Sequence, residues 1–339
     1  MWLVVVWLAV LPLATTAVAT VSLLRPELRG IVSPPPSLTT ATIDDASLLS
    51  IRMGVQQDQP ESLYLLAMLQ YYGHGMDRDV ASAVKLLRRA AQYAHRDAEF
   101  ALGVLHSTTT AARSEPAGGG GVQKSDRVSA MWLANSASRG HVDAKWMLAI
   151  LYNEGRGVEE NVPRAVELLQ DAARDGNPHA QFHLGVMHEY GRGVAQNFTQ
   201  AAQLYASAAE RGIPDAMYYL GLLYAQGRGV SQSFTTAMAL FRQAAADPLG
   251  KERDAGDGHA PAMYALGQMH ANGQGTAIDY TLALTWLRKA ERRQDPRISG
   301  VAKQVANEIE TFLEHVETRV QEQEQALGAP IKVTVGVIE

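Results

Sequence analysis

Three histidines close together form the part of this sequence that most resembles a metal site. His179 and His183 lie four residues apart, and His188 follows them. Two histidines at this spacing share one face of a helix and can bind a metal. His188-Glu189 is not followed by the second histidine of a zinc-protease motif, and the position of His188 is repeated along the chain, where another copy holds Tyr152. We therefore favour a packing or surface role, and we expect no metal and no cofactor.

Other catalytic patterns are equally weak. The Gly-x-Gly pairs follow a helical pattern rather than a strand, and no Gly-Lys-Ser/Thr accompanies them, so they are not phosphate-binding loops. The chain has no cysteine, which excludes disulfides, thiolate zinc sites and a cysteine nucleophile. Glu159-Glu160 is typical of a solvated turn, and chain order alone supports no Ser-His-Asp triad. We predict that the protein is not an enzyme.

One sequence pattern occurs three times between residues 143 and 247 and must position all of these side chains. The copies keep a step of 36 residues, as at Ala144, Ala180 and Ala216. The same step separates leucines and alanine pairs, namely Leu168, Leu204 and Leu240, and residues 172–173, 208–209 and 244–245. A fixed period of this length indicates a solenoid, in which each unit buries its apolar face against its neighbours.

Each copy predicts two helices joined by a glycine turn. In the copy from Ala180 onward, apolar residues with helical spacing precede Gly191 and Gly193, and a second helix follows, with Asn197 or Thr199 as its cap. Glycine reaches positive φ at little steric cost, so each pair stops the first helix. The turn glycines are Gly73, Gly75, Gly155, Gly157, Gly191, Gly193, Gly227, Gly229, Gly273 and Gly275. Gly-x-Pro, as at 176–178, separates successive units.

Three more copies bring the total to about six. Residues 62–96 and 97–142 form two divergent copies, the second with an insertion at 107–118, and a sixth copy starts near Ala262 after extra residues at 248–258. Both insertions are polar or glycine-rich. We expect them to be surface loops, which in repeat arrays often lie on the binding side.

The pattern A-x-x-x-L-G-x-x-Y-x-x-G-x-G-V, followed by A-x-x-L-x-x-x-A-A-x-x-G, resembles the Sel-one-like repeat (SLR), a relative of the tetratricopeptide repeat (TPR). The resemblance implies an all-α fold: a right-handed α-α superhelix, or solenoid, of SLR/TPR-like helix pairs over residues 60–295. It also implies that first helices line a concave groove that binds peptides or helices of partner proteins. Groove candidates are Lys145, Trp146, Gln181, His183, Met217 and Tyr219. For each of them, packing between repeats is the alternative.

The first 24 residues carry no charged side chain. As a helix, residues 2–24 would span roughly 35 Å, enough for a bilayer, while Ala17-Val18-Ala19 is typical of a signal-peptidase site. We favour a cleaved export signal over an uncleaved signal anchor, which would associate the protein with the membrane. If it is an anchor, Arg25 and Arg29 would orient the repeats toward the cytosol. Residues 25–59 are predicted to be a proline-containing linker with a short helix near 44–50.

The repeat pattern stops after Pro296. Residues 296–327 predict an amphipathic helix with an apolar face of Val301, Val305, Ile309, Phe312, Val316 and Val320. We favour a capping helix over a coiled-coil seam. Residues 328–339 form a tail whose alternation is strand-like. Asn197-Phe198-Thr199 is an N-glycosylation sequon, relevant if the chain enters a secretory lumen.

Net charge is −5 and the sequence pI is about 6.1, so no basic excess supports nucleic-acid binding. We predict a non-enzymatic interaction scaffold of the secretory pathway, in the ER lumen or membrane-associated. With its leader, the chain resembles the lumenal adaptor of the ubiquitin-ligase complex for ER-associated degradation over residues 60–292, although it has fewer units and no C-terminal span. A membrane-anchored cytosolic adaptor is the main alternative, and a secreted hydrolase is a remote one.

Overall fold

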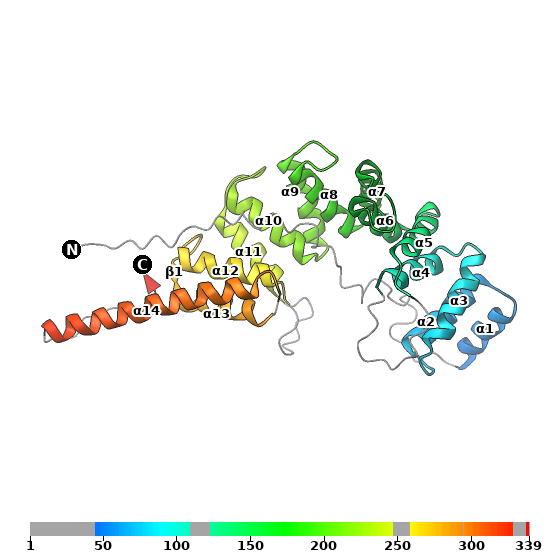
Figure 1. Cartoon of the computed structure of the whole chain (residues 1–339), viewed down its shortest axis with the longest axis horizontal. Coiled ribbons are helices and arrows are strands. Elements are labelled where there is room, and N and C mark those ends of the chain that lie inside the picture. Colours follow the sequence, from blue (N-terminus) through cyan, green and yellow to red (C-terminus); the bar gives the residue numbers. More distant parts are fainter. Residues whose placement is uncertain (1–44, 109–122, 247–257, 294, 328–336, 339) are drawn as a thin grey trace. The chain divides into compact units, whose positions relative to one another are not determined.

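The computed structural model describes residues 45–108, 123–246, 258–293, 295–327 and 337–338 (Figure 1). The predicted leader, the proline-rich part of the linker, most of both insertions and most of the tail lie outside these ranges. The described chain divides into an N-terminal unit, up to Ala180, and a C-terminal unit, from Gln181 onward. Each unit is described by itself.

The described residues form fourteen helices and two short strands. Six helix pairs are flanked by one extra helix at each end, which confirms the all-α helical repeat solenoid. The pairs are α2 (Pro60–Tyr72) with α3 (Val80–Gln92), α4 (Arg96–Thr108) with α5 (Asp126–Ser138), α6 (Val142–Glu154) with α7 (Val162–Arg174), α8 (Pro178–Tyr190) with α9 (Phe198–Glu210), α10 (Pro214–Gln226) with α11 (Phe234–Ala245), and α12 (Ala260–Asn272) with α13 (Tyr280–Arg292).

The two helices of a pair have different surroundings. First helices are apolar on most sides, and in α6 every residue from Trp146 to Leu151 is buried. Second helices are amphipathic, and α7 buries only one side, which includes Ala165, Leu169 and Ala172. This difference is expected because first helices lie between neighbouring units, whereas second helices keep one face in water.

Both glycines of each turn have positive φ, between 65° and 75° at all ten positions. The first ends the helix, as at Gly227, whose N–H donates to the Leu223 carbonyl. At Gly157, Gly229 and Gly275 the second also lies against the backbone of the preceding helix pair. A Cβ on Gly229 would meet the carbonyl carbon of Phe198 and lie 2.5 Å from its oxygen. The second glycine therefore allows two units to approach closely, as well as permitting the backbone conformation.

The glycine of the Leu-Gly step has a different function inside the helix. A Cβ on Gly185 would lie 2.7 Å from the Tyr205 ring, and one on Gly221 would lie 2.6 Å from the Phe241 ring. Both sites let an aromatic ring of the second helix contact the backbone of the first. The small residues of the pattern thus determine how closely the helices of a pair pack.

The N-terminal unit begins with α1 (Asp45–Gln56), which is longer than the short helix expected near 44–50. Its Leu48, Ile51 and Val55 pack against the core of α2, α3 and α4, whereas Leu49 and Met53 are exposed. The last residues of the predicted linker therefore belong to the folded array. Their apolar residues recur at helical spacing, which the sequence analysis did not count.

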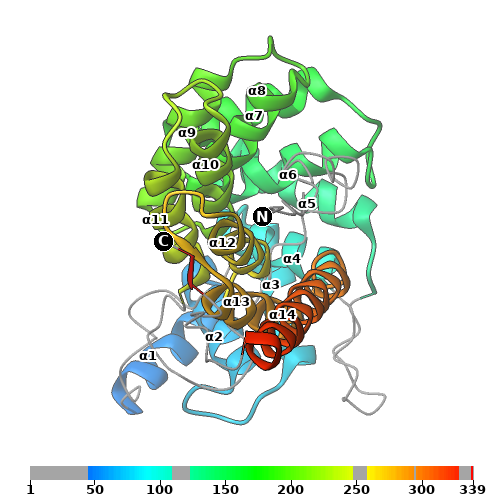
Figure 2. The same cartoon turned by 90° about the vertical axis from the view of Figure 1, so that its left-hand side faces the viewer.

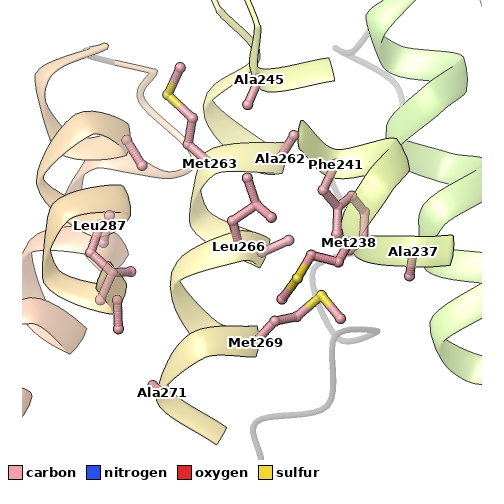
Figure 3. Packing of buried hydrophobic residues seen from close by; sticks show 14 of the residues in the cluster. Ala237, Met238, Phe241, Ala245, Ala262, Met263, Leu266, Met269, Ala271 and Leu287 are labelled. Atoms are coloured by element: carbon pink, nitrogen blue, oxygen red, sulfur yellow. The ribbon is translucent and has the colours of Figure 1, made fainter. Parts of the chain in front are cut away.

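The core of the C-terminal unit lies between α11, α12 and α13. Figure 3 shows Leu266 of α12 with Leu287 of α13 on one side and Phe241 and Met238 of α11 on the other. Leu266, Leu287 and Phe241 are fully buried. This core couples one pair to the next, as the period predicts.

The terminal helix α14 (Ser299–Leu327) packs on α13 and covers this end of the array (Figure 2). Its buried residues are Ala302, Ala306 and Ile309, with Phe312 partly buried beside them. Val301, predicted to lie on the apolar face, is 39% exposed. The predicted apolar face consisted of large apolar residues. The face that packs closely on α13 contains the small residues Ala302 and Ala306 instead.

The second half of α14 projects beyond α12 and α13 (Figure 1), and its Val316 and Val320 are partly exposed. Strand β2 (Val337–Ile338) then pairs antiparallel with β1 (Ile278–Asp279), which precedes α13. The strand-like alternation of the tail thus corresponds, in the described residues, to a two-residue strand. Across the described residues, no helix combines the length and apolar character that a membrane crossing requires.

Candidate protein-binding surface

The two candidates from the N-terminal unit are engaged within the fold. Lys145 Nζ lies 2.8 Å from Asp175 Oδ2, and the Lys145 side chain is mostly covered. Trp146 is 1% exposed, and its ring stacks on His179 with centroids 5.0 Å apart. The prediction that Trp146 faces a groove is therefore corrected, because its side chain lies between two neighbouring helix pairs. A partner would contact little of its surface.

The candidates on α8 are also largely covered. His183 is buried, so the prediction that it faces a partner is corrected in the same way. Gln181 is half-buried, and its Oε1 has no hydrogen-bond partner within the described residues. The described residues, His183 and His188 among them, contain no group of three or more side chains that could hold a metal ion.

The candidates on α10 are half-buried and keep surface. Tyr219 lies 5.6 Å from the Phe182 ring and 5.7 Å from the Tyr205 ring, centroid to centroid. Tyr218 stands edge-on to it at 5.5 Å. Met217, on the same turn, packs against the core of α11 and α12. The aromatic neighbours hold Tyr219 in one orientation while part of its ring stays accessible.

Tyr190, at the end of α8, is the exposed aromatic that the sequence analysis missed. It is 43% exposed and close enough to Tyr219 and Tyr218 to influence their ionisation. We call Tyr190, Tyr218 and Tyr219 the tyrosine patch. Burial raises the pKa of all three phenols, so they are neutral and available as hydrogen-bond donors at neutral pH. The sequence feature that could have identified Tyr190 as exposed is its position in Glu189-Tyr190, directly before the glycine turn.

A buried polar pair supports this patch from below. Tyr205 Oη donates to Glu189 Oε2 at 2.7 Å, and both side chains are buried. Burial raises the pKa of Glu189, opposed by the Tyr205 hydrogen bond and the charge of Arg228. Removing a carboxylate from water is costly unless a donor compensates, so Glu189 is held at its hydrogen bond to Tyr205. This contact fixes the end of α8, whose last residue is Tyr190.

Two acids next to the patch each have a partner. Asp215 Oδ1 lies 3.1 Å from His259 Nε2, and Arg297 binds Asp295 at 2.7 Å. The three tyrosines themselves offer aromatic area and hydroxyl donors. This composition is typical of protein-binding surfaces and lacks a nucleophile beside a general base.

Asn197 caps α9 through its side chain. Its Oδ1 accepts from the Gln200 N–H at 3.0 Å, and the residue is exposed. Thr199 of the same sequon is exposed too, and its hydroxyl donates to the Gly229 carbonyl at 3.3 Å. The capping bond uses the amide oxygen, so the amide nitrogen, to which a glycan would attach, is not the atom that caps the helix.

The Sel1 repeat family matches the chain at residues 60–92, 142–177, 178–213, 214–247 and 260–295, just over half of its length. The chain belongs to the Sel1 repeat family. The five Sel1 repeats correspond to five of the six helix pairs. The sixth pair, α4 with α5, is the copy in which the sequence places an insertion.

Solved structures show the same fold. One is a protective antigen present in uropathogenic Escherichia coli strains, displaying an SLR fold (22% identity, TM-score 0.62), in a match over 83% of this chain. This chain spans 52% of that protein's length. Another is a Sel1 repeat protein from Oxalobacter formigenes (27% identity, TM-score 0.60), matching 77% of this chain and 70% of that one. Comparison with curated proteins gave no match.

Proposed function

We propose that this Sel1 repeat protein is a non-enzymatic adaptor whose tyrosine patch contacts partner proteins. Sel1 repeat proteins are generally protein–protein interaction scaffolds. The observation that carries the proposal is the combination at Tyr219: an aromatic side chain that is partly exposed yet held by Phe182 and Tyr205. A side chain ordered in advance loses little conformational entropy on binding.

Tyrosine suits this role physically. Its ring provides contact area with two rotatable side-chain bonds, and its hydroxyl bonds to a peptide backbone, which is why tyrosine is enriched among residues that dominate interface energies. Met217 on the same helix supplies an adaptable apolar contact. The surface thus fits an extended peptide or helix of a partner.

The test compares two variants in proximity labelling, followed by binding measurements with each purified candidate. Tyr190→Ala with Tyr219→Ala removes two of the three tyrosines of the patch, and Tyr93→Ala removes an aromatic ring that is 51% exposed in the N-terminal unit. We expect specific partners to lose at least ~10-fold in affinity for the first variant and to keep it for the second. Equal binding by both variants would reject the patch as the binding surface.

We further propose that the scaffold works in the secretory pathway, where quality control or ER-associated degradation would supply its partners. The uncharged leader and the exposed sequon at Asn197 support this proposal. Glycosidase treatment, combined with protease protection in microsomes, tests it. A glycan at Asn197 on protected repeats is the expected result. Unglycosylated repeats that are digested from outside would favour the membrane-anchored cytosolic adaptor.

A further inference from the structure

Three histidines cap first helices through their side chains. His95, His141 and His259 each stand directly before a first helix, and in each case Nδ1 accepts from the backbone N–H three residues on, at 3.2 to 3.3 Å. A backbone N–H can only donate, so Nδ1 must carry a lone pair. The proton of the neutral imidazole is therefore on Nε2.

That Nε2 proton is directed at an acid of the preceding unit. His95 Nε2 lies 2.9 Å from Glu61, His141 Nε2 lies 3.3 Å from Asp97, and His259 Nε2 lies 3.1 Å from Asp215. Each acid is the second residue of the preceding first helix. We call these three contacts the histidine bridges. Each one joins the start of one helix pair to the start of the next.

The chain holds a natural variant of the bridge that cannot titrate. Asn177 precedes α8, and its Oδ1 accepts from the Ala180 N–H at 2.8 Å. Its Nδ2 donates to Asp143 Oδ1 at 2.7 Å. Asparagine thus makes both hydrogen bonds of the histidine bridge, with a donor and an acceptor that do not change between pH 8 and pH 5.

One junction lacks the bridge at both ends. Ile213 precedes α10 and makes no side-chain cap, and the acid position of the preceding first helix holds His179. Loss of the cap and loss of the acid occur together here.

We propose that the histidine bridges are acid-sensitive joints, which connect neighbouring repeats at neutral pH and weaken, by losing the Nδ1 cap, when the imidazole takes up a proton. Histidine is the side chain whose charge ordinarily changes between pH 5 and pH 8. Protonation places a hydrogen on Nδ1. This hydrogen then faces the backbone N–H from which Nδ1 previously accepted its hydrogen bond. The cap is lost, and a positive charge sits at the positive end of a helix dipole.

The carboxylate opposes release but is the weaker partner. Protonation converts the Nε2 contact into an ion pair, and the acids are well exposed, with side-chain exposures of 70% for Glu61, 38% for Asp97 and 46% for Asp215. Ion pairs at exposed sites contribute little because water and salt screen them. Loss of an N-cap acceptor consistently destabilises helices.

Other charges near the bridges must be counted. In the N-terminal unit, His95 also faces the carboxylates of Asp97 and Glu99, and Tyr64 stacks on its ring. His141 faces Asp97, with Phe100 stacked on it at 4.2 Å. The hydrogen bond from His141 lowers the pKa of Asp97, so that carboxyl stays ionised throughout the range in which histidine titrates.

In the C-terminal unit, His259 faces Asp215 and, at longer range, Asp295, and Tyr218 of the tyrosine patch lies 5.0 Å from its ring. Arg297 pairs with Asp295 and also acts on Asp215. A cation already next to this acid weakens its attraction for a second positive charge.

The experiment compares the full chain with the triple variant His95→Asn, His141→Asn and His259→Asn, which converts every histidine bridge to the form of Asn177. The other histidines are the same in both proteins. We expect the wild type to melt lower at pH 5.0 than at pH 7.5, by roughly 2 to 4 °C more than the variant does. The same pH dependence in both proteins would overturn the proposal.

Two further measurements test the proposal if the triple variant folds poorly. Asn177→His installs a fourth bridge and should increase the pH dependence of melting, whereas no increase would count against the joint. Nitrogen NMR of the wild type at pH 7.5 should place the imidazole proton on Nε2 at His95, His141 and His259. Finding it on Nδ1 would contradict the bridge geometry directly.

Discussion

Glycine shows most clearly how one residue type serves both turn and packing. Gly229 has φ of +71°, and a Cβ there would collide with the Phe198 backbone. Gly212 has φ of +84°, but nothing lies within 4 Å of a Cβ. Both alanine variants strain the backbone, at about 1 kcal/mol. Gly229→Ala also separates two units, so it should cost at least ~1 kcal/mol more in denaturant unfolding. Equal losses would mean that the contact is unimportant.

The buried pair under the tyrosine patch gives a pH-dependent prediction. Tyr205→Phe leaves Glu189 without its donor and should destabilise the fold by about 1–3 kcal/mol at pH 7.5. Burial raises the pKa of Glu189, and losing the hydrogen bond raises it further. The folded state then holds the proton more tightly, so stability is recovered as pH falls. We expect a smaller loss at pH 4.5, measured by urea unfolding, with Glu189→Gln as the uncharged control.

Predictions for single residues were right where the residue type determines the backbone conformation. They were wrong where the outcome depends on whether the side chain is buried. Glycine pairs after an apolar helix determine a backbone conformation, and their φ values follow that rule. Trp146 was placed on a groove because it is aromatic, but it lies between units and stacks on His179. The histidine bridges leave a signal in the gap-free copies, where an acid precedes a histidine or asparagine by 34 residues, as at Glu61 and His95.

At the scale of elements, the terminal helix shows the limits of counting large apolar residues. Ile309 is 1% exposed on α14, and Val301, one of the predicted face, is 39% exposed. Ile309→Ala should cost about 2–5 kcal/mol because a cavity opens against α13. Val301→Ala should change stability by less than ~0.5 kcal/mol. Chemical unfolding with hydrogen exchange on α13 and α14 measures both, and a large effect of Val301→Ala would restore the predicted face.

The buried face of α14 could not be identified from the sequence, because alanine does not show whether its position is buried or exposed. Ala302 and Ala306 are fully buried, yet alanine is equally common on exposed helix surfaces. Within the repeats the same ambiguity disappears, since the period identifies Ala144, Ala180 and Ala216 as equivalent and all three are fully buried. Periodicity supplies the information on packing that one unrepeated helix lacks.

At the scale of the whole molecule, the fold followed from the period, and the sixth pair followed from the same rule. The Sel1 repeat family matches five units, but α4 and α5 form a further pair around an insertion. A unit that cannot bury its apolar face alone must stack on its neighbours, so residues 97–142, which lie between two other copies, had to form a pair as well. The partner surface depends on which side chains stay exposed, and the period does not determine this.

The pH profile of the whole chain tests these arguments together. The pKa of Asp97 is lowered chiefly by the His141 hydrogen bond, and that of Asp215 is lowered because the hydrogen bond and charge of His259 outweigh burial. A lowered carboxyl pKa stabilises the fold above about pH 4 and loses that contribution as pH falls through the folded value. Glu99 and Glu189, whose pKa values are raised by burial, act in the opposite direction.

We therefore expect the melting temperature to fall in two windows as pH is lowered, first as the histidine bridges take up protons and then below about pH 4 as Asp97 and Asp215 do. The triple histidine-to-asparagine variant should flatten the first window. Asp97→Asn with Asp215→Asn should reduce the second. Scanning calorimetry across pH on the wild type and both variants measures both windows. The histidine variant should also lessen the second window, because the His141 and His259 contacts lower the pKa of Asp97 and Asp215. A second window that the aspartate variant leaves unchanged would place the acid-labile groups elsewhere in the chain.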